Sequence, residues 1–273
     1  MLGRFFTALA IALALATGSA AQTTELVFAV TEGVTYQATP KEIRDRFAPL
    51  AEAIGRAVHR PVRTVVVPAY DDLRAGLAAQ QFDVAFVHPA HVALAEIKTG
   101  RYRSIAWTTG FTDYTVSLMM PAKDPLGSMR DLRGRTLVTP DPDSITAVMV
   151  RAMVRDQQLS AGELKVITTR YQDAVPFYLE HGFAHVGATA AKSVVKGWTD
   201  KGGKVLTQSR GVPIKQFIAS SRLPTYDQVR IQEALTGLAS AKNGPSVLAT
   251  VGYKGFVVPD PQVETATIAW LGL

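Results

Sequence analysis

The chain has 273 residues, of which 47% are hydrophobic and 19% charged, and it carries 29 basic residues, 23 acidic residues and no cysteine. This composition is too apolar for a disordered chain, and the lack of cysteine excludes a disulfide-stabilised small domain and a thiolate metal site. The length suffices for one large or two modest domains, and no internal apolar run reaches the roughly 18 residues that suggest a membrane span.

Residues 1–21 have the pattern of a secretory signal peptide. Arg4 precedes the apolar stretch 5–16, and small residues at Ser19 and Ala21 form a cleavage site. A short N-terminal membrane anchor is the alternative, but this stretch is shorter than the roughly 20 residues of a span. We expect cleavage after Ala21 and an exported protein, with no lipid anchor because no cysteine follows the apolar run.

The charge of the mature chain is mildly positive. Arg4 is the one charged residue of the first 21, so its removal leaves 28 basic against 23 acidic residues. The basic residues are spread along the chain and lack the clustering that nucleic-acid binding requires. We therefore expect no nucleic-acid partner. A small anionic ligand suits this charge, although many exported proteins carry a similar excess.

Strand and helix patterns alternate at the start of the mature chain. Strands are predicted at residues 25–30, 61–67 and 82–87, and helices at residues 40–58, 70–80 and 90–98. The apolar spacing in 40–58 is typical of an amphipathic helix, and the run 82–87 is typical of a buried strand. This alternating order predicts an α/β fold with a mostly parallel sheet.

A second α/β unit follows. Residues 105–109 close the first unit. In the second, helices are predicted at residues 144–157 and 174–180, and strands at residues 115–120, 136–138, 165–168, 185–188 and 204–208. A last part carries a strand at 214–219 and a helix at 227–238, followed by the tail to residue 273. The last part returns toward the first unit, which predicts two lobes joined by crossings near 109–114 and 208–212. Lobe 1 is expected to span residues 22–109 plus 212–273, and lobe 2 residues 110–211.

The segment 141–146 is predicted to begin a helix. Pro140 and Pro142 prevent an earlier start, and Ser144 opens an amphipathic pattern. The first backbone N–H groups of a helix are unpaired and its dipole is positive there, so an oxyanion at this point gains several donors. The hydroxyls of Ser144 and Thr146 can add two more. The alternative is that Ser144, or Asp143 before it, is only an N-cap.

Two histidine pairs have spacings compatible with metal ligation, His88 with His91 and His181 with His185. No carboxylate completes either pair, so we expect no metal and no cofactor. His88 directly follows a predicted strand, at the edge where open α/β sheets bind ligands. A ligand hydrogen bond from His88 is therefore predicted, whereas His59 and His181 are expected on the surface.

Four segments occur together in one order: 69–73, 82–86, 131–135 and 141–146. In this order the chain resembles the periplasmic substrate-binding proteins of phosphonate, phosphite and phosphate ABC transporters, over nearly the whole mature length. The resemblance implies a two-lobe periplasmic binding protein fold, type II-like, with mostly parallel sheets and hinge crossings. It also implies a periplasmic location and membrane permease subunits as partners. We expect a monomer.

The resemblance also assigns ligand contacts. Tyr70 and Tyr114 match ligand-contacting tyrosines, and a phosphonate-contacting histidine falls at Gln172, or at Tyr171 if the alignment slips by one. The usual Ser-Thr-Ser of the family becomes Ser-Ile-Thr here, which removes the central hydroxyl but keeps the backbone donors. The predicted ligand-binding residues are Tyr70, His88, Tyr114, Ser144, Ile145, Thr146, Tyr171 and Gln172.

The same resemblance bears on ligand selectivity. Aminophosphonate-binding members place carboxylates at positions that correspond to Lys192, Val212 and His185 here. A carboxylate pair for a ligand amine is therefore missing at these positions. We expect a phosphonate, phosphite or phosphate without an amine, and a carboxylate ligand is left open.

No sequence pattern indicates an enzyme. The chain lacks Gly-x-Ser-x-Gly, a phosphate-binding Gly-x-x-x-x-Gly-Lys, and a nucleophile with a neighbouring base. Asp141 and Asp143 flank Pro142, which indicates a turn and not a catalytic carboxylate pair. The predicted function is solute capture for an ABC importer. A ligand-binding accessory of a membrane sensor kinase is the alternative, and an exported hydrolase is the third.

Overall fold

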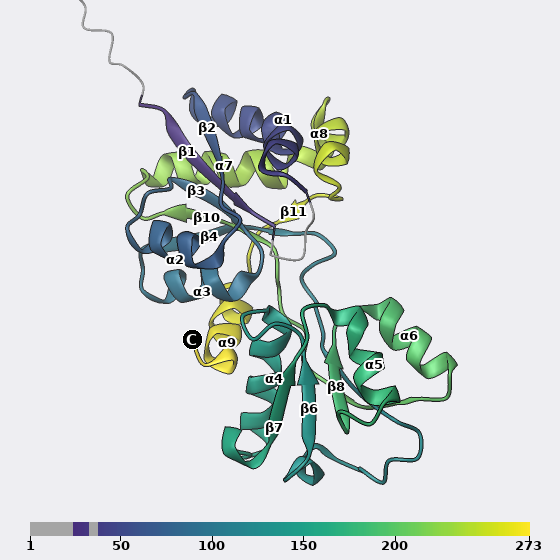
Figure 1. The fold of residues 1–273 in the computed structure, drawn as a ribbon. Helices are drawn as coiled ribbons and strands as arrows, with labels where there is room; N and C mark the ends of the chain where they lie inside the picture. The colour runs from purple at the N-terminus through teal and green to yellow at the C-terminus, as the bar shows by residue number, and fades with distance from the viewer. Residues whose placement is uncertain (1–23, 33–37) are drawn as a thin grey trace, which may run out of the picture.

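The computed structural model describes residues 24–32 and 38–273, and in this part the chain forms two sheets flanked by helices (Figure 1). The predicted signal peptide and its cleavage site lie outside the described residues. Within the described part, no helix is both long and apolar enough to cross a membrane.

The first sheet has the order β11-β4-β10-β3-β1-β2. Its strands are β1 (Leu26–Thr31), β2 (Val62–Val66), β3 (Val84–Val87), β4 (Tyr102–Thr108), β10 (Gln216–Ser220) and β11 (Phe256–Val257). The helices around it are α1 (Pro40–Val58), α2 (Tyr70–Ala78), α3 (Ala90–Lys98), α7 (Thr225–Thr236) and α8 (Gly244–Val251). Helix α1 begins with a capping box, in which Thr39 accepts from the N–H of Glu42 and the Glu42 side chain accepts from the N–H of Thr39.

The second sheet has the order β7-β6-β8-β5-β9. Its strands are β5 (Ser117–Met120), β6 (Thr136–Thr139), β7 (Lys165–Thr168), β8 (Val186–Thr189) and β9 (Lys204–Gln208). The remaining helices are α4 (Ile145–Asp156), α5 (Val175–Glu180), α6 (Lys192–Asp200) and α9 (Pro261–Leu271). Short 3-10 turns are η1 (Met129–Leu132), η2 (Ala161–Glu163), η3 (Gln172–Ala174) and η4 (Leu238–Ser240).

Most strands of each sheet run in one direction. Strand β1 pairs in parallel with β2 and β3, and β10 lies antiparallel between β3 and β4, so β4 runs with β3. In the second sheet, β6 pairs in parallel with β7 and β8, and β5 lies antiparallel between β8 and β9. Strands β5 and β10 run opposite to their neighbours because of the path of the chain. Each follows a crossing directly, so it enters its sheet at the side where the neighbouring strands end. The carboxyl ends of the parallel strands therefore face the opposite sheet.

The two crossings pair with each other. Tyr114 and Val212 form an isolated antiparallel bridge, with two backbone hydrogen bonds of 3.0 Å, and the N–H of Ile214 donates to the carbonyl of Phe111. These contacts turn two separate segments into one short ribbon between the sheets. The exact lobe boundaries stay a prediction.

Helix α9 contacts both halves of the molecule. It packs against α3 and α4 between the two sheets (Figure 1). Trp270 and Leu271 are buried in the apolar cluster of the second half, and the Trp270 indole N–H donates to Asp156 at 2.7 Å. The C-terminal segment thus arrives from the first sheet and ends against the second.

Sequence patterns missed or misplaced some element ends. Helix α6 was not predicted, because it lacks a polar N-cap and buries only Trp198, in its last turn. The strand predicted at 105–109 begins earlier, at Tyr102, because that ring is buried and its hydroxyl donates to the carbonyl of Phe82 at 2.9 Å. The helix predicted at 144–157 begins at Ile145, with Ser144 as its N-cap.

Four phenylalanines form the centre of the first core. Phe28, Phe47, Phe86 and Phe217 are fully buried, and neighbouring ring centroids lie 5.0 to 6.4 Å apart. These distances suit tilted and offset ring contacts, which add to the free energy gained from apolar burial. Strands β1, β3 and β10 and helix α1 are therefore fixed to one another.

We predict that Phe86→Ala lowers the free energy of unfolding by about 3–5 kcal/mol, because it removes a buried ring and leaves a cavity. Urea unfolding followed by circular dichroism measures this loss. Phe183→Ala is the control, because Phe183 is 57% exposed and should cost less than about 1 kcal/mol. Equal losses in the two variants would contradict this account of the core.

Candidate ligand-binding site

A small cavity of about 50 Å³ lies between the two sheets. Its walls come from segments that follow the carboxyl ends of strands and from the first crossing. The residues that line it are Tyr70, His88, Pro89, Tyr114, Pro140, Asp141, Ser144, Ile145, Thr146, Arg170 and Gln172. All but one of the predicted ligand-binding residues are therefore brought together. The exception, Tyr171, lines an adjoining cavity.

The start of helix α4 provides backbone donors to this cavity. The Ser144 hydroxyl oxygen accepts from the N–H of Ala147 at 3.2 Å, and its carbonyl accepts from the N–H of Val148 at 3.0 Å. Among the described residues, the N–H groups of Ile145 and Thr146 have no acceptor. Ser144 is thus an N-cap, as one reading of the sequence had it, and it still has a hydroxyl proton to donate.

Hydroxyl and amide groups form a hydrogen-bonded chain along one wall. The Tyr114 hydroxyl lies 3.0 Å from the hydroxyl of Thr146, and the Gln172 amide donates to Tyr114 at 3.4 Å. The Gln172 carbonyl is occupied, since it accepts from Thr189 at 3.1 Å and from the N–H of Ala190 at 2.6 Å. Two hydroxyl protons are therefore present on Tyr114 and Thr146, and their mutual contact uses only one. The other can be donated to a ligand.

His88 presents a neutral ring to the cavity. Its Nδ1 lies 3.1 Å from the carbonyl of Ile214, which places the proton on Nδ1 and leaves Nε2 as an acceptor. Burial, together with the charge of Lys215, lowers the pKa of His88 to about 4. At neutral pH the ring can therefore accept a hydrogen bond from a protonated oxygen.

Lys215 supplies positive charge behind the cavity. Its side chain is only 4% exposed, and its Nζ lies 4.2 Å from the centroid of Phe111 and 3.4 Å from the hydroxyl of Tyr253. Burial lowers the pKa of Lys215 to about 8. Tyr253 in turn donates to the buried carboxylate of Glu32 at 2.9 Å, and Glu32 pairs with Arg46. Sequence reasoning missed this network because its members lie far apart in the chain.

Arg170 is a cation that sequence reasoning also missed. It follows β7, so it lies at a strand's carboxyl end, the position that could have revealed it. Its guanidinium lies 5.3 Å from the centroid of the Tyr171 ring. Within residues 24–32 and 38–273, no ion pair or hydrogen bond to this guanidinium is found.

The carboxylate at the cavity is Asp141. One of its oxygens accepts from the N–H of Asp143 at 2.8 Å, so the Asp-Pro-Asp segment forms the expected turn. Lys192, Val212 and His185 are not among the lining residues. Val212 is buried in the crossing, and the His185 ring accepts from the N–H of Thr136 at 3.1 Å. The three positions on which the expectation of a ligand without an amine was based therefore do not line this cavity, and the expectation stays a prediction.

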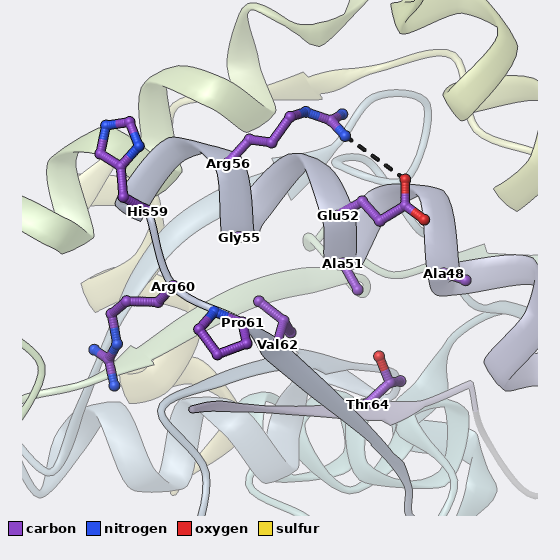
Figure 2. A pocket seen from close by; sticks show the side chains of 10 residues that line it. All are labelled: Ala48, Ala51, Glu52, Gly55, Arg56, His59, Arg60, Pro61, Val62 and Thr64. Carbon is purple, nitrogen blue, oxygen red and sulfur yellow. Dashed lines mark ion pairs between the residues drawn. The ribbon is translucent and has the colours of Figure 1, made fainter. Parts of the chain in front are cut away.

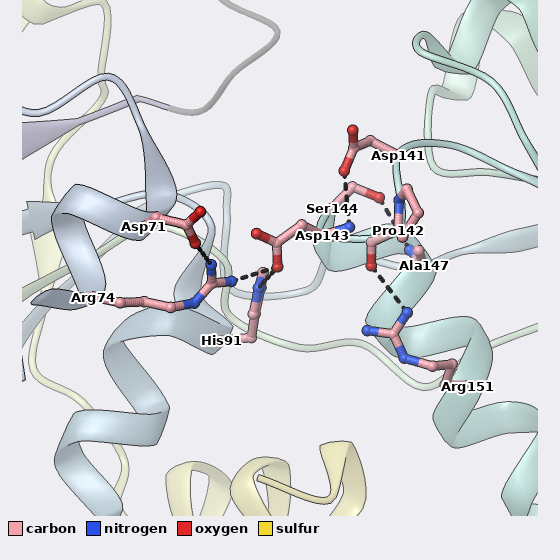
Figure 3. A network of polar contacts seen from close by, with 9 residues as sticks. All are labelled: Asp71, Arg74, His91, Asp141, Pro142, Asp143, Ser144, Ala147 and Arg151. Atoms are coloured by element: carbon pink, nitrogen blue, oxygen red, sulfur yellow. Dashed lines mark hydrogen bonds and ion pairs between the residues drawn. The ribbon is translucent and has the colours of Figure 1, made fainter.

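An ion-pair network joins the two halves beside the cavity (Figure 3). Arg74 of α2 pairs with Asp71 at 3.1 Å and with Asp143, which precedes α4. The Nε2 of His91, on α3, lies 3.7 Å from the same Asp143 oxygen. Burial lowers the pKa of His91 to about 4. Arg74 and Asp143 come from opposite sides of the cleft, so their pair holds the two sides together.

A larger cavity of about 770 Å³ lies elsewhere, between α1 and β2 (Figure 2). Its described lining includes Arg56, His59 and Arg60, and Arg56 pairs with Glu52, one turn away on the same helix α1, at 3.6 Å. None of the predicted ligand-binding residues is among them. The size of a cavity therefore does not identify the ligand-binding site. The small cavity is the candidate because strand ends of both sheets and unpaired backbone N–H groups meet there.

We predict that the ligand-free protein loses stability as the pH falls from about 6.5 toward 4. His88 and His91 bind protons more weakly in the folded chain, so the unfolded chain takes up more protons in this range. The expected loss at pH 5 is about 2 kcal/mol for each histidine. Urea unfolding at pH 7 and pH 5 measures it.

His91→Gln should reduce this pH dependence, and His59→Gln, at an exposed position, should leave it unchanged. An unaltered dependence in His91→Gln would refute the assignment to His91.

Comparisons with known proteins agree with the geometry. Residues 33–263 match the model of a family described as ABC transporter, phosphonate, periplasmic substrate-binding protein. No curated protein sequence is significantly similar.

Several solved structures share the fold. XAC2383 of Xanthomonas citri, solved with ATP, is 14% identical with a TM-score of 0.73, over 91% of this chain and 97% of that one. PhnD1 of Prochlorococcus marinus, solved with methylphosphonate, is 12% identical with a TM-score of 0.63, over 90% and 96%. A binding protein of a phosphonate transporter from Pseudomonas aeruginosa is 13% identical with a TM-score of 0.60, over 92% and 86%.

These structures confirm the predicted two-lobe α/β fold. The family supports the transporter hypothesis and gives no support to the sensor accessory. Since the family model spans most of the chain, this protein belongs to the periplasmic substrate-binding proteins of phosphonate ABC transporters.

Proposed function

We propose that the protein captures a phosphonate or a related tetrahedral oxyanion in the 50 Å³ cavity and presents it to its membrane permease. The observation that carries this proposal is the pair of N–H groups on Ile145 and Thr146. Among the described residues they have no acceptor, and they belong to a helix start that lines the cavity. A bound oxyanion would satisfy both and would meet the positive end of the α4 dipole.

The side chains around this helix start support the same ligand. Thr146 and Tyr114 together have one hydroxyl proton to spare, and Ser144 has another. Arg170 adds a positive charge without a carboxylate partner in the described part of the chain. The neutral ring of His88 can accept from a protonated ligand oxygen, which would favour a phosphonate or phosphate over a fully ionised sulfonate.

Structures of the same fold support this ligand class. Two of them were solved with methylphosphonate and with ATP, both of which carry tetrahedral phosphorus groups. The presence of Asp141 beside the cavity leaves room for an amine on the ligand, contrary to the expectation from Lys192, Val212 and His185. Calorimetry with methylphosphonate and aminoethylphosphonate decides between the two.

The remaining parts of the proposal concern the whole protein. Residues 1–21 act as a signal peptide that is cleaved after Ala21. The mature protein works in the periplasm as a monomer, with membrane permease subunits and no nucleic acid as partners. It binds its ligand without chemical change, as membership of a family of substrate-binding proteins implies.

We predict that methylphosphonate binds the wild-type protein and binds Thr146→Val about tenfold more weakly, because a hydroxyl in contact with a charged ligand is lost. Ser144→Ala should weaken binding similarly and should also cost about 1 kcal/mol of stability through the lost cap. Calorimetry and melting of the ligand-free variants separate the two effects.

Thr199→Val is the matched control, because Thr199 is an exposed threonine on α6 in the same half of the molecule. If Thr146→Val and Ser144→Ala both bind as tightly as the wild type, the anion does not bind at the start of α4.

We also predict that Arg74→Gln weakens ligand binding about two- to fivefold, because it removes an ion pair that favours the closed cleft. The weakening should shrink at high salt, where an exposed pair is screened. Lys41→Gln breaks an exposed pair with Asp45 on α1, far from the cleft, and should leave affinity unchanged. An equal effect of both variants would argue against a contribution of Arg74 to closure.

A further inference from the structure

A second cavity of about 350 Å³ adjoins the small one and opens toward solvent. The two cavities share Tyr70, Asp141 and Arg170. The other residues that line the outer cavity are Ala69, Asp71, Asp143 and Tyr171. Both halves of the molecule contribute to it, so it forms the mouth of the cleft.

The sizes of the two cavities limit what the ligand can be. About 50 Å³ holds a single tetrahedral group and little else, whereas about 350 Å³ lies in the range of pockets for organic ligands, roughly 300–1,000 Å³. A substituent on the tetrahedral group would therefore leave the inner cavity past Tyr70 and Arg170 and enter the outer one. A purely inorganic anion would leave the outer cavity to water.

The groups in the outer cavity differ in whether they already have partners. Asp71 and Asp143 both pair with Arg74, as Figure 3 shows, so their charges are compensated. Tyr171 is 38% exposed, and Arg170 covers its ring at 5.3 Å without an ion pair in the described part of the chain. An aromatic ring beside a planar guanidinium forms a flat, amphipathic surface that suits a ring more than a flexible chain.

We propose that the natural ligand is a phosphonate or phosphate monoester whose organic group carries a ring, and that this ring lies in the outer cavity against Tyr171 and Arg170. This inference rests on the proposed function, because the tetrahedral group must occupy the inner cavity. It adds the substituent class, and it gives Tyr171 a role distinct from binding the oxyanion.

Calorimetry with methylphosphonate and phenylphosphonate tests the proposal, since the two probes share a head group and differ in the ring. The wild-type protein should bind phenylphosphonate about tenfold more tightly, because the ring gains aromatic contact and leaves water. In Tyr171→Ala this difference should fall below about threefold, while the affinity for methylphosphonate changes by less than about twofold. Phe183→Ala removes another exposed aromatic ring of the same half and should change neither affinity.

The outcomes separate this inference from the proposed function. If methylphosphonate binds and phenylphosphonate binds no more tightly, the ring inference is overturned and the proposed function stands. Equal weakening of both probes in Tyr171→Ala would place Tyr171 at the oxyanion and also overturn it. If neither probe binds the wild-type protein, the proposed function fails and the inference fails with it.

Discussion

The site depends on one constraint of backbone chemistry: the first N–H groups of a helix have no partner inside that helix. At the start of α4, Ser144 satisfies the N–H of Ala147, and the N–H groups of Ile145 and Thr146 are left facing a cavity between the lobes. Other parts of the structure determine where these N–H groups lie. The proline-containing turn before α4 sets where the helix begins, and the parallel strands of both sheets end at the same cleft.

Positive charge around the cavity comes from groups of different kinds. Lys215 is buried behind it, and Arg170 lies at its opening. His88 carries no charge at neutral pH, because burial and the nearby lysine oppose its protonation. The charge is thus placed at the back and at the mouth, while the groups in between act through hydrogen bonds. Hydrogen bonds are directional, whereas charge attracts any anion, so the former are better suited to distinguish one tetrahedral ligand from another.

Much of the fold could be predicted from local pattern. Helix α1 was predicted at the observed residues from its apolar spacing, and in the structure a proline in its first turn and a capping threonine favour the same start. Helix α6 was missed because it has no such cap and lies largely exposed. The reversed directions of β5 and β10 follow from the path of the chain between the lobes, which no local pattern encodes. The predicted site residues mostly meet at one cavity. His88 and the start of α4 were taken from a strand end and a helix start, whereas the tyrosines and Gln172 came from the family resemblance. Arg170 and Lys215 were missed because their importance depends on which distant residues surround them.

Tyr114 combines two roles in one residue. Its backbone N–H and carbonyl pair with Val212 to join the crossings, and its side-chain hydroxyl contacts Thr146 and Gln172 at the cavity wall. Tyr114 therefore belongs both to the crossing between the lobes and to the wall of the cavity, and no layer of other side chains separates the two. Any rotation about the crossings carries this hydroxyl with it, so the angle between the lobes and the shape of the cavity wall change together. The outer faces of the two lobes move relative to each other in the same rotation.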